Sequence, residues 1–389
     1  MKLKKMLAVA LLAMSAMGFQ IVNAQSLSPS SKWHWDKGTI VINTPERPAG
    51  QEHVLGLTAA PIKTVRVGFV GLGMRGPSAV IRFCQIPGVE IVALCDYEEK
   101  RAEAQQRHLR NAGLAPATIY YGEKGYEELC KRPDVDLIYI ATDWNHHFPV
   151  AKCAMENGKH AAIEVPSAMN LEQCWNLIDL SEKTRLHCFI LENCCYDDYE
   201  MKSLLMAQDG VFGEVIRAEG AYIHELSEFW KYYWKDPNDN DKDNLHWRMK
   251  YNMENRGDLY ATHGLGPVAQ CMDIHRGDRF TTLIAMDTES FAGKEWVKKN
   301  TGKEPEEFRN GDHTTTLMRT AKGKVVEIQH NVMTPQPYNR LFKLTGTKGY
   351  ATKYPTEEFA IAGDALTGTD APKMDNINAH GFLNAEQKK

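Results

Sequence analysis

The sequence lacks a strong excess of either charge. Its 389 residues include 46 Lys and Arg against 50 Asp and Glu, which gives a formal net charge of −4. A mildly acidic chain has no electrostatic footprint for a phosphate backbone, so we expect no nucleic-acid partner. The chain also lacks the composition of a disordered protein, because 43% of its residues are hydrophobic and 25% are charged. The length predicts a folded protein of two or three domains.

The nine cysteines lack the spacing of a disulfide framework or a zinc site. Neither a C-x-x-C motif nor a cysteine–histidine ligand pattern occurs, so we expect no metal. Most of the cysteines fall inside apolar or helical patterns, where buried thiols behave as small hydrophobic groups. The adjacent Cys194 and Cys195 leave a redox pair open as an alternative.

Long apolar runs are scarce, and one at the N-terminus approaches membrane-spanning length. Residues 6–22 carry no charge, follow a basic segment at residues 1–5, and end near the small residue Ala24. This pattern predicts a secretory signal peptide at residues 1–24, and an uncleaved membrane anchor is the alternative. We expect cleavage, and therefore an exported bacterial protein, periplasmic or secreted, without a stable membrane span.

Two regions of different texture follow an N-terminal arm or linker at residues 25–61. At residues 62–193, apolar strand-like segments alternate with helical patterns, which predicts an α/β domain with a doubly wound parallel sheet, a Rossmann domain. The strands are expected at residues 64–71, 90–96, 135–141, 160–164 and 188–191, and helices at residues 98–112, 149–157 and 171–182.

Residues 194–389 predict a C-terminal α+β domain with an open, mostly antiparallel sheet. A long strand is expected at residues 213–224, a polar aromatic loop at 229–255 and a helix at 263–275. Two hairpins follow, with turns at residues 321–324 and 346–349.

A glycine-rich motif joins the first predicted strand to a helical pattern. Gly71, Gly73 and Gly76 form a G-x-G-x-x-G sequence, and Asp96 ends the next strand, 20 residues after Gly76. In this context the glycines permit a tight turn, close approach of a pyrophosphate, and helix–strand packing. The acidic side chain would accept hydrogen bonds from the adenosine ribose, so we expect NAD rather than NADP. A glycine turn without a ligand is the alternative.

Polar residues follow the other strands of this domain, at the edge where an open α/β sheet binds its ligands. The residues expected to line the nicotinamide half come from the segments 142–147, 164–166 and 192–193, and include Trp144, Asn145, His146 and His147. One of the two histidines is expected to face solvent.

These motifs resemble those of the glucose–fructose oxidoreductase and inositol dehydrogenase (Gfo/Idh/MocA) family over residues 62–360. The resemblance rests on residues 71–76, Asp96, residues 141–147 and residues 164–166. Sugar dehydrogenases of that family usually carry Glu-Lys-Pro where this chain has Glu164-Val165-Pro166, and that lysine assists proton removal. The valine therefore disfavours simple dehydrogenation.

A more specific resemblance is to glycoside hydrolase family 109, carried by residues 164–166, 192–196, 246–248 and 260–267 together. It implies α-N-acetylgalactosaminidase activity with tightly bound NAD. The NAD contacts that it implies, besides Gly71, Gly73 and Gly76, are Met74, Arg75, Asp96, Trp144, His147, Glu164, Val165 and Asn193. The sugar contacts that it implies are Tyr222, Arg248, Tyr260, Ala261, Thr262, His263 and Tyr338.

The resemblance also implies a mechanism that recycles NAD in each turnover. C3 of a terminal α-N-acetylgalactosaminyl residue is oxidised, a base removes the C2 proton, the aglycone leaves C1 by elimination, water adds, and C3 is reduced again. Tyr222 is the expected base, and His263 is the expected second catalytic residue, at the C3 hydroxyl or the leaving oxygen. Phenol and imidazole groups suit proton transfer, and a guanidinium such as that of Arg248 can hold sugar hydroxyls.

Two other functions remain open at this point. One is an exported sugar oxidoreductase of the same fold with bound NAD(P), and the other is a non-catalytic sugar-binding relative. A homo-oligomer is a further expectation. Members of the resembled family usually continue beyond the equivalent of Gly381 and Phe382, so we expect the second domain to be C-terminally truncated.

Overall fold

The computed structural model describes residues 33–43, 46–47, 49–227 and 245–362, which form two units, residues 1–55 and residues 56–389. The expected signal peptide lies outside the described residues. In the first unit β1 (Trp33–Asp36) pairs antiparallel with β2 (Thr39–Ile42), a hairpin that the sequence pattern did not predict. Its turn residues Lys37 and Gly38 both have positive φ, 48° and 83°, as a two-residue hairpin turn requires.

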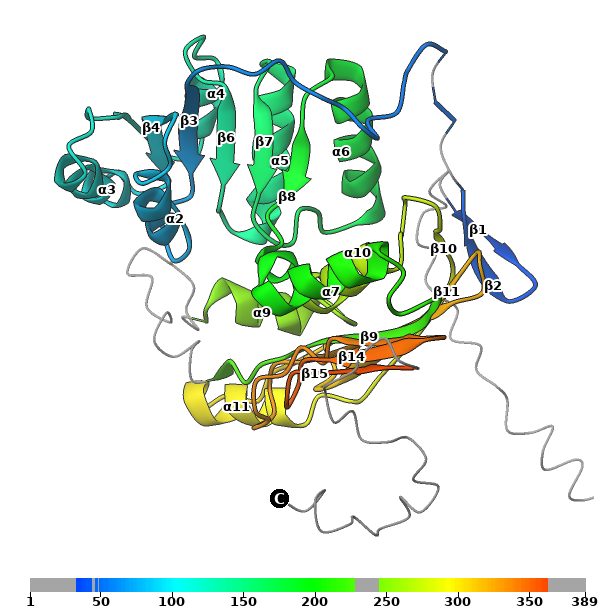
Figure 1. Ribbon diagram of the computed structural model, residues 1–389. Helices are drawn as coiled ribbons and strands as arrows, with labels where there is room; N and C mark the ends of the chain where they lie inside the picture. The colour runs from blue at the N-terminus through cyan, green and yellow to red at the C-terminus, as the bar shows by residue number, and fades with distance from the viewer. Residues whose placement is uncertain (1–32, 44–45, 48, 228–244, 363–389) are drawn as a thin grey trace, which may run out of the picture. The chain divides into compact units, whose positions relative to one another are not determined.

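The second unit begins with the predicted parallel sheet. Six strands lie in the order β5-β4-β3-β6-β7-β8, and every ladder is parallel (Figure 1). The strands are β3 (Val65–Val70), β4 (Val89–Asp96), β5 (Thr118–Tyr121), β6 (Leu137–Ile140), β7 (His160–Ile163) and β8 (Cys188–Ile190). The apolar side chains of the inner strands β3, β4, β6 and β7 are mostly buried on both faces, at about 1.5–3 kcal/mol for each one fully buried, as the continuous hydrophobic runs predict, whereas Phe189 and Ile190 of the edge strand β8 are 43% and 37% exposed. The short edge strand β5 was not predicted.

Helices cover both faces of this sheet (Figure 1). They are α2 (Gly76–Phe83), α3 (Glu99–Asn111), α4 (Gly125–Cys130), α5 (Trp144–Glu156) and α6 (Leu171–Thr184). After β8 the chain passes through the 3-10 helix η1 (Asn193–Tyr196) and α7 (Asp198–Gln208) into the second sheet. The predicted Rossmann domain is therefore confirmed.

The second sheet has seven strands in the order β10-β11-β12-β9-β13-β14-β15. Its ladders are antiparallel except for β12 with β9, so the prediction of a mostly antiparallel sheet is also confirmed. The strands are β9 (Val215–Ile223), β10 (Phe280–Asp287), β11 (Thr314–Thr320), β12 (Val325–Asn331), β13 (Lys343–Gly346), β14 (Gly349–Thr352) and β15 (Glu358–Ile361). Both hairpins lie where the turns predicted them.

Helices account for the main difference from the sequence analysis in this region. Helix α9 (Trp247–Glu254) forms inside the stretch expected to be a loop, because His246 caps its N-terminus by accepting the N–H of Arg248 at 3.2 Å. The predicted helix at 263–275 is α10 (Thr262–Cys271), and α11 (Ala292–Thr301) was not predicted. Among the described residues, no helix is long and apolar enough to cross a membrane.

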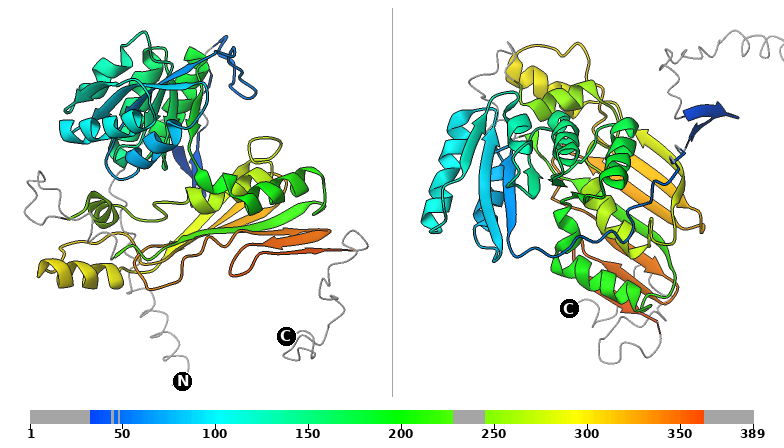
Figure 2. Two further views of the ribbon diagram at one scale, coloured as in Figure 1. Left: turned by 60° about the vertical axis from the view of Figure 1, so that its left-hand side comes forward. Right: turned by 90° about the horizontal axis from the view of Figure 1, so that it is seen from above.

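Helix α10 lies on the face of the mixed sheet that is turned towards the Rossmann sheet, beside α7 (Figures 1 and 2). Two glycines set its distance from β9. A Cβ on Gly220 would lie 2.2 Å from the carbonyl oxygen of Gly264, and one on Gly264 would lie 2.4 Å from the nitrogen of Ala221. No larger side chain fits at either position, so helix and strand backbones touch.

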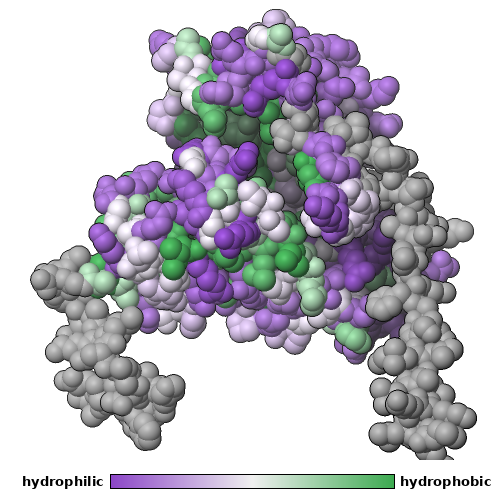
Figure 3. Space-filling model, turned by 90° about the vertical axis from the view of Figure 1, so that its right-hand side faces the viewer, coloured by the Kyte–Doolittle hydropathy of each residue, from purple (hydrophilic) through white to green (hydrophobic). Residues whose placement is uncertain are grey.

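Apolar side chains remain exposed along β10 and β11, with Leu283, Ile284 and Met286 each more than half exposed. Figure 3 views the side on which β10 lies in Figure 1, and shows hydrophobic patches among hydrophilic surface. The homo-oligomer stays a prediction.

A group of four charges, of which Arg340 and Glu200 are buried, ties α7 to the mixed sheet. Arg340 is 5% exposed and lies 2.5 Å from Asp197 and 3.4 Å from Glu200, while Lys353 lies 2.7 Å from Glu200 and 3.2 Å from Asp197. Glu200 is itself 2% exposed, and these two cations compensate the cost of burying its side chain.

We predict that Arg340→Met lowers the free energy of unfolding by about 3 kcal/mol, because it leaves the buried carboxylate of Glu200 paired with Lys353 alone. The matched control is Arg217→Met, which removes a cation that pairs with Glu219 and Glu327 but is 43% exposed. That control should cost less than about 1 kcal/mol. Denaturant unfolding of both variants checks this, and equal losses would contradict it.

Candidate active site

A single cleft of about 910 Å³ runs from the carboxyl ends of the Rossmann strands to β9 and α10. Its lining joins the glycine-rich motif, the loops after β6 and β7, and aromatic side chains of the second sheet domain. The structure thus brings the two predicted halves of the site, for a dinucleotide and for a sugar, into one continuous space.

The glycine motif has the geometry that a dinucleotide requires. Gly71 has φ of 93° and a Cβ there would lie 2.4 Å from the carbonyl carbon of Ala141, while a Cβ on Gly76 would lie 2.1 Å from the Gly71 oxygen. At Gly73, in contrast, a Cβ would meet only the Arg101 guanidinium, at 3.7 Å. Gly73 therefore keeps open the space into which a pyrophosphate can approach the backbone, and the residues present fit NAD.

Asp96 fixes this motif as well as facing the cleft. Its Oδ2 accepts the N–H of Leu72 at 2.6 Å, and its Oδ1 accepts the N–H of Glu98 at 3.0 Å. A carboxylate has about four acceptor positions, so ribose hydroxyls can still bind. Arg101, which the sequence analysis missed, lies 3.7 Å from Oδ1 and also lines the cleft.

The two histidines after β6 differ, as predicted. His146 is half exposed and pairs with Asp143 at 2.6 Å, whereas His147 is 1% exposed, with its Nδ1 at 2.6 Å from the carbonyl oxygen of Pro166. Burial lowers the pKa of His147, which keeps it neutral.

Glu164 is held at the end of β7. It accepts a hydrogen bond from the Tyr139 hydroxyl at 2.6 Å and lies 3.5 Å from the Arg75 guanidinium. The predicted cofactor residues that line the cleft are Gly71, Gly73, Met74, Arg75, Asp96, Trp144, His146, His147, Glu164, Val165 and Asn193. Gly76 and Asn145 lie outside the lining.

The substrate half centres on Tyr222, at the end of β9. Its ring lies 4.8 Å from that of Tyr260 and 5.2 Å from that of His263, and its hydroxyl is 3.1 Å from Nδ1 of His224. Burial raises the pKa of Tyr222 to about 12 and lowers that of His224. The pair is therefore a neutral phenol hydrogen-bonded to a neutral imidazole. His224 lies within the predicted strand 213–224 and was not expected from the sequence to belong to the site.

Arg248 lies among aromatic rings that hold its guanidinium towards the cleft. The guanidinium carbon is 5.2 Å from the Trp144 ring, 5.3 Å from Trp247 and 5.5 Å from Tyr260. Cation–π contact orients the charge without neutralising it, so its N–H groups remain donors for sugar hydroxyls. His246 beside it, whose pKa burial lowers to about 4, is neutral.

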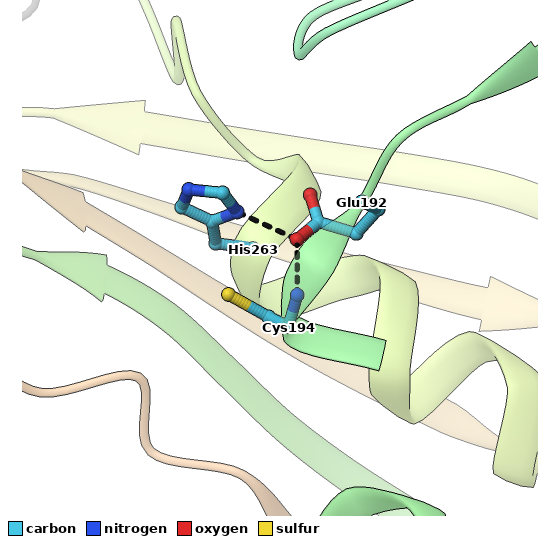
Figure 4. A group of neighbouring side chains, drawn as sticks. All are labelled: Glu192, Cys194 and His263. Atoms are coloured by element: carbon cyan, nitrogen blue, oxygen red, sulfur yellow. Dashed lines mark hydrogen bonds and ion pairs between the residues drawn. The ribbon is translucent and has the colours of Figure 1, made fainter. Parts of the chain in front are cut away.

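Glu192 and His263 form a buried hydrogen-bonded pair next to Cys194 (Figure 4). Nδ1 of His263 lies 2.6 Å from Oε1 of Glu192, which also accepts the N–H of Cys194 at 3.0 Å. Burial raises the pKa of the thiols of Cys194 and Cys195 to about 12, and all nine cysteines are free. Both thiols are thus buried and protonated rather than reactive.

The predicted sugar contacts mostly come together. Tyr222, Arg248, Tyr260, His263 and Tyr338 line the cleft, whereas Ala261 and Thr262 lie outside the lining. From the sequence, Glu192 was expected only as a polar residue at the end of a strand. Its hydrogen-bond partner His263 is 71 residues away, and no local sequence pattern links the two.

Two family models match the chain. One, described as "Oxidoreductase family, NAD-binding Rossmann fold", matches residues 65–191, and the other, "Glycosyl hydrolase 109, C-terminal domain", matches residues 196–372. The boundary between the two matches falls where β8 leads into η1.

Similar proteins carry the same family name. Glycosyl hydrolase family 109 protein 3 of Phocaeicola vulgatus is 78% identical over 389 residues, which are 100% of this chain and 70% of that protein. Protein 1 of Bacteroides thetaiotaomicron is 54% identical over 351 residues, which are 90% of this chain and 73% of that protein.

Solved structures share the fold at low identity. A myo-inositol dehydrogenase from Lactobacillus casei, in complex with NAD(H) and myo-inositol, aligns with a TM-score of 0.55 at 19% identity, over 81% of each chain. An NAD-binding oxidoreductase from Klebsiella pneumoniae aligns with a TM-score of 0.58 at 19% identity, over 78% of this chain and 81% of the other.

The two glycine environments predict different outcomes for two substitutions. Gly73→Val fills the open space beside the motif and should abolish NAD retention while leaving the melting temperature of the NAD-free protein nearly unchanged. Gly71→Ala forces a Cβ against the Ala141 backbone at a positive φ and should destabilise the NAD-free protein itself. Native mass spectrometry and thermal unfolding measure both effects, and full NAD retention by Gly73→Val would contradict the assignment.

Proposed function

The chain belongs to glycosyl hydrolase family 109, and from this premise we propose that it is an exported, NAD-dependent α-N-acetylgalactosaminidase. Its substrate is a glycan or small glycoside with a terminal α-N-acetylgalactosaminyl residue. The observation that carries the proposal is the single cleft in which a dinucleotide motif adjoins a group of buried proton-transfer side chains.

The charges of the cleft favour this route over ordinary glycoside hydrolysis. Most glycosidases place two carboxyl groups on either side of the glycosidic bond, and NAD-dependent families are an exception. Here the carboxyls that line the cleft are Asp96, Glu123, Asp143 and Glu164, and they belong to the half with the glycine motif. The described titratable side chains that line the cleft around Tyr222 are tyrosines, histidines, an arginine and Cys194, while the carboxylate of Glu192 lies outside the lining, hydrogen-bonded to His263.

When bound, NAD⁺ supplies reversible oxidation at C3 of the sugar, which acidifies the hydrogen at C2. Tyr222 then removes the C2 proton. Its phenol can act as a base because the hydroxyl lies 3.1 Å from Nδ1 of His224, so in the tautomer with hydrogen on Nε2 its own proton can pass to that neutral imidazole. Loss of the C2 proton expels the aglycone from C1 and leaves a double bond to which water adds.

The other side chains orient the ring and move protons. His263 serves the C3 hydroxyl, Arg248 holds sugar hydroxyls, and Tyr260 and Tyr338 flank the ring. Stacking of Trp144 on Tyr260, at 5.4 Å between ring centroids, keeps the aromatic wall rigid.

Val165 argues against a sugar oxidoreductase. It occupies the position at which related sugar dehydrogenases usually carry a lysine, is 4% exposed, and offers no proton-transfer group. A non-catalytic sugar-binding protein has no need of the Tyr222–His224 pair or of a buried, paired histidine.

Export follows from the N-terminal pattern and agrees with the proposed chemistry. A cofactor that is bound before export and regenerated in each turnover does not depend on NAD outside the cytoplasm. The mature protein would then carry its NAD with it.

Elimination predicts exchange at C2. Hydrolysis of C2-deuterated p-nitrophenyl α-N-acetylgalactosaminide in ordinary water should release sugar that has lost the deuterium, because the proton returned to C2 comes from solvent. Mass spectrometry of the product measures this. Deuterium retained throughout the product would rule out the elimination route, while oxidised sugar without glycoside cleavage would favour the oxidoreductase.

Tyr222→Phe should lower kcat by about 100-fold or more, since it removes the base while keeping the ring. The matched control is Tyr251→Phe, a tyrosine that packs against Trp144 but does not line the cleft. Steady-state kinetics and bound NAD are measured for both. Undiminished turnover in Tyr222→Phe would exclude it as the base.

A further inference from the structure

We infer that Glu192 is a positioning residue that fixes the tautomer and orientation of His263, so that Nε2 of His263 is the atom that accepts the proton of the C3 hydroxyl. The inference rests on the proposed function for the identity of that hydroxyl. The orientation of the histidine rests on the structure alone.

The geometry of the pair is specific. The Glu192 side chain is 6% exposed and that of His263 is 12% exposed, with 2.6 Å between Oε1 and Nδ1 (Figure 4). The same oxygen accepts the backbone N–H of Cys194, which prevents the carboxylate from turning away. A carboxylate has no proton to donate, so Nδ1 must carry the hydrogen of this contact, and whenever the ring is neutral Nε2 is the acceptor.

The negative charge of Glu192 survives burial. Burial itself opposes ionisation, but the hydrogen bond and charge of His263 and the N–H of Cys194 together hold the pKa of Glu192 below its usual value. The carboxylate is therefore present to stabilise the imidazolium that forms when Nε2 takes a proton.

The proton balance of the step is simple. As C3 becomes a ketone, the O–H bond of its hydroxyl breaks and the proton forms a bond to Nε2 of His263. NAD⁺, when bound as in the proposed function, would take up the C3 hydrogen with its electron pair. On re-reduction the same proton returns to the oxygen.

Glu192 and His263 come from different parts of the fold. Glu192 follows β8 of the Rossmann domain, whereas His263 is on the first turn of α10 in the second domain. Gly266 makes their approach possible, because a Cβ there would lie 2.9 Å from Cγ of Glu192. The part of the fold that binds the nicotinamide thus also orients the proton acceptor.

The same three side chains could be read as a metal site, since ligand atoms of Glu192, Cys194 and His263 lie within 4.8 Å of one another. Two observations favour the hydrogen-bonded pair. Nδ1 of His263 faces Oε1 of Glu192 at the hydrogen-bond distance of 2.6 Å, and the same oxygen accepts the backbone N–H of Cys194 at 3.0 Å, whereas Oε2 of Glu192 has no hydrogen-bond partner among the described residues. Bound metal is an outcome of the test.

The first test measures the tautomer directly and needs no activity. The NAD-loaded protein is labelled with ¹⁵N-histidine, and the His263 signals are identified by their loss in His263→Asn. We expect hydrogen on Nδ1 and none on Nε2 in the wild type, with a shift towards the other tautomer in Glu192→Ala. An unchanged tautomer in Glu192→Ala, or stoichiometric metal whose removal by EDTA alters the signals, would overturn the inference.

The second test separates positioning from folding. Glu192→Ala should lower kcat by about 100-fold with a much smaller change in KM, and Glu192→Gln, which keeps a hydrogen-bond acceptor, should recover part of the loss. The control is Glu200→Gln, another buried glutamate, which should lower stability more than kcat. A loss in Glu192→Ala that merely follows its melting temperature and NAD content would overturn the inference.

The outcomes also separate the inference from the proposed function. A wild-type protein that shows the expected tautomer but cleaves no α-N-acetylgalactosaminide would refute the proposed function and leave the orientation of His263 by Glu192 standing. Glycoside cleavage by the wild type, together with a Glu192→Ala variant whose His263 tautomer and kcat are unchanged, would support the proposed function and overturn the inference.

Discussion

The site depends on the backbone contact between α10 and β9. Gly220 and Gly264 let the helix touch the strand, and this contact places Tyr260 and His263 against Tyr222, with ring centroids about 5 Å apart. The next glycine of α10, Gly266, leaves room for Glu192 on the Rossmann side. Helix α10 therefore sets the distances between side chains of β9, of the start of α10 and of the segment that follows β8. A methyl group on Gly220 or Gly264 would push α10 away from β9, and His263 would then move away from Tyr222.

The environment of each group then determines its protonation state. Burial raises the pKa of Tyr222 and lowers that of His224, so each is neutral near pH 7, and a proton can pass from the phenol to the imidazole. At Glu192, hydrogen bonds outweigh burial and preserve a charge. The two histidines therefore have different hydrogen-bond partners, a neutral phenol for His224 and a carboxylate for His263. This difference supports assigning the first to the C2 proton and the second to the C3 hydroxyl.

The sequence predicted the elements whose signal is local. Long apolar strands such as β3, β4 and β9 have continuous or strongly β-branched patterns, and the glycine motif carries its own geometry. Three short elements were not predicted because few residues define each of them: the edge strand β5, the hairpin β1–β2 and the capped helix α9. The site shows the same division. Tyr222 and His263 were found through a family resemblance, whereas the Glu192–His263 and Tyr222–His224 contacts depend on tertiary packing or on side-chain direction, which no spacing encodes.

Val165, which stands where sugar dehydrogenases of the resembled family usually carry a lysine, agrees with the proposed place of proton transfer. In the related sugar dehydrogenases the lysine at the end of the equivalent strand assists proton removal from the Rossmann side of the cleft. Val165 is buried and inert, so the proposed oxidation needs another acceptor, and the Rossmann domain contributes a carboxylate, Glu192, that acts through a histidine of the second domain. The acceptor thus sits on α10, beside the β9 tyrosine that would remove the C2 proton. Under the proposed function, this relocation brings oxidation and elimination within reach of the same bound sugar, which then need not move between the two steps.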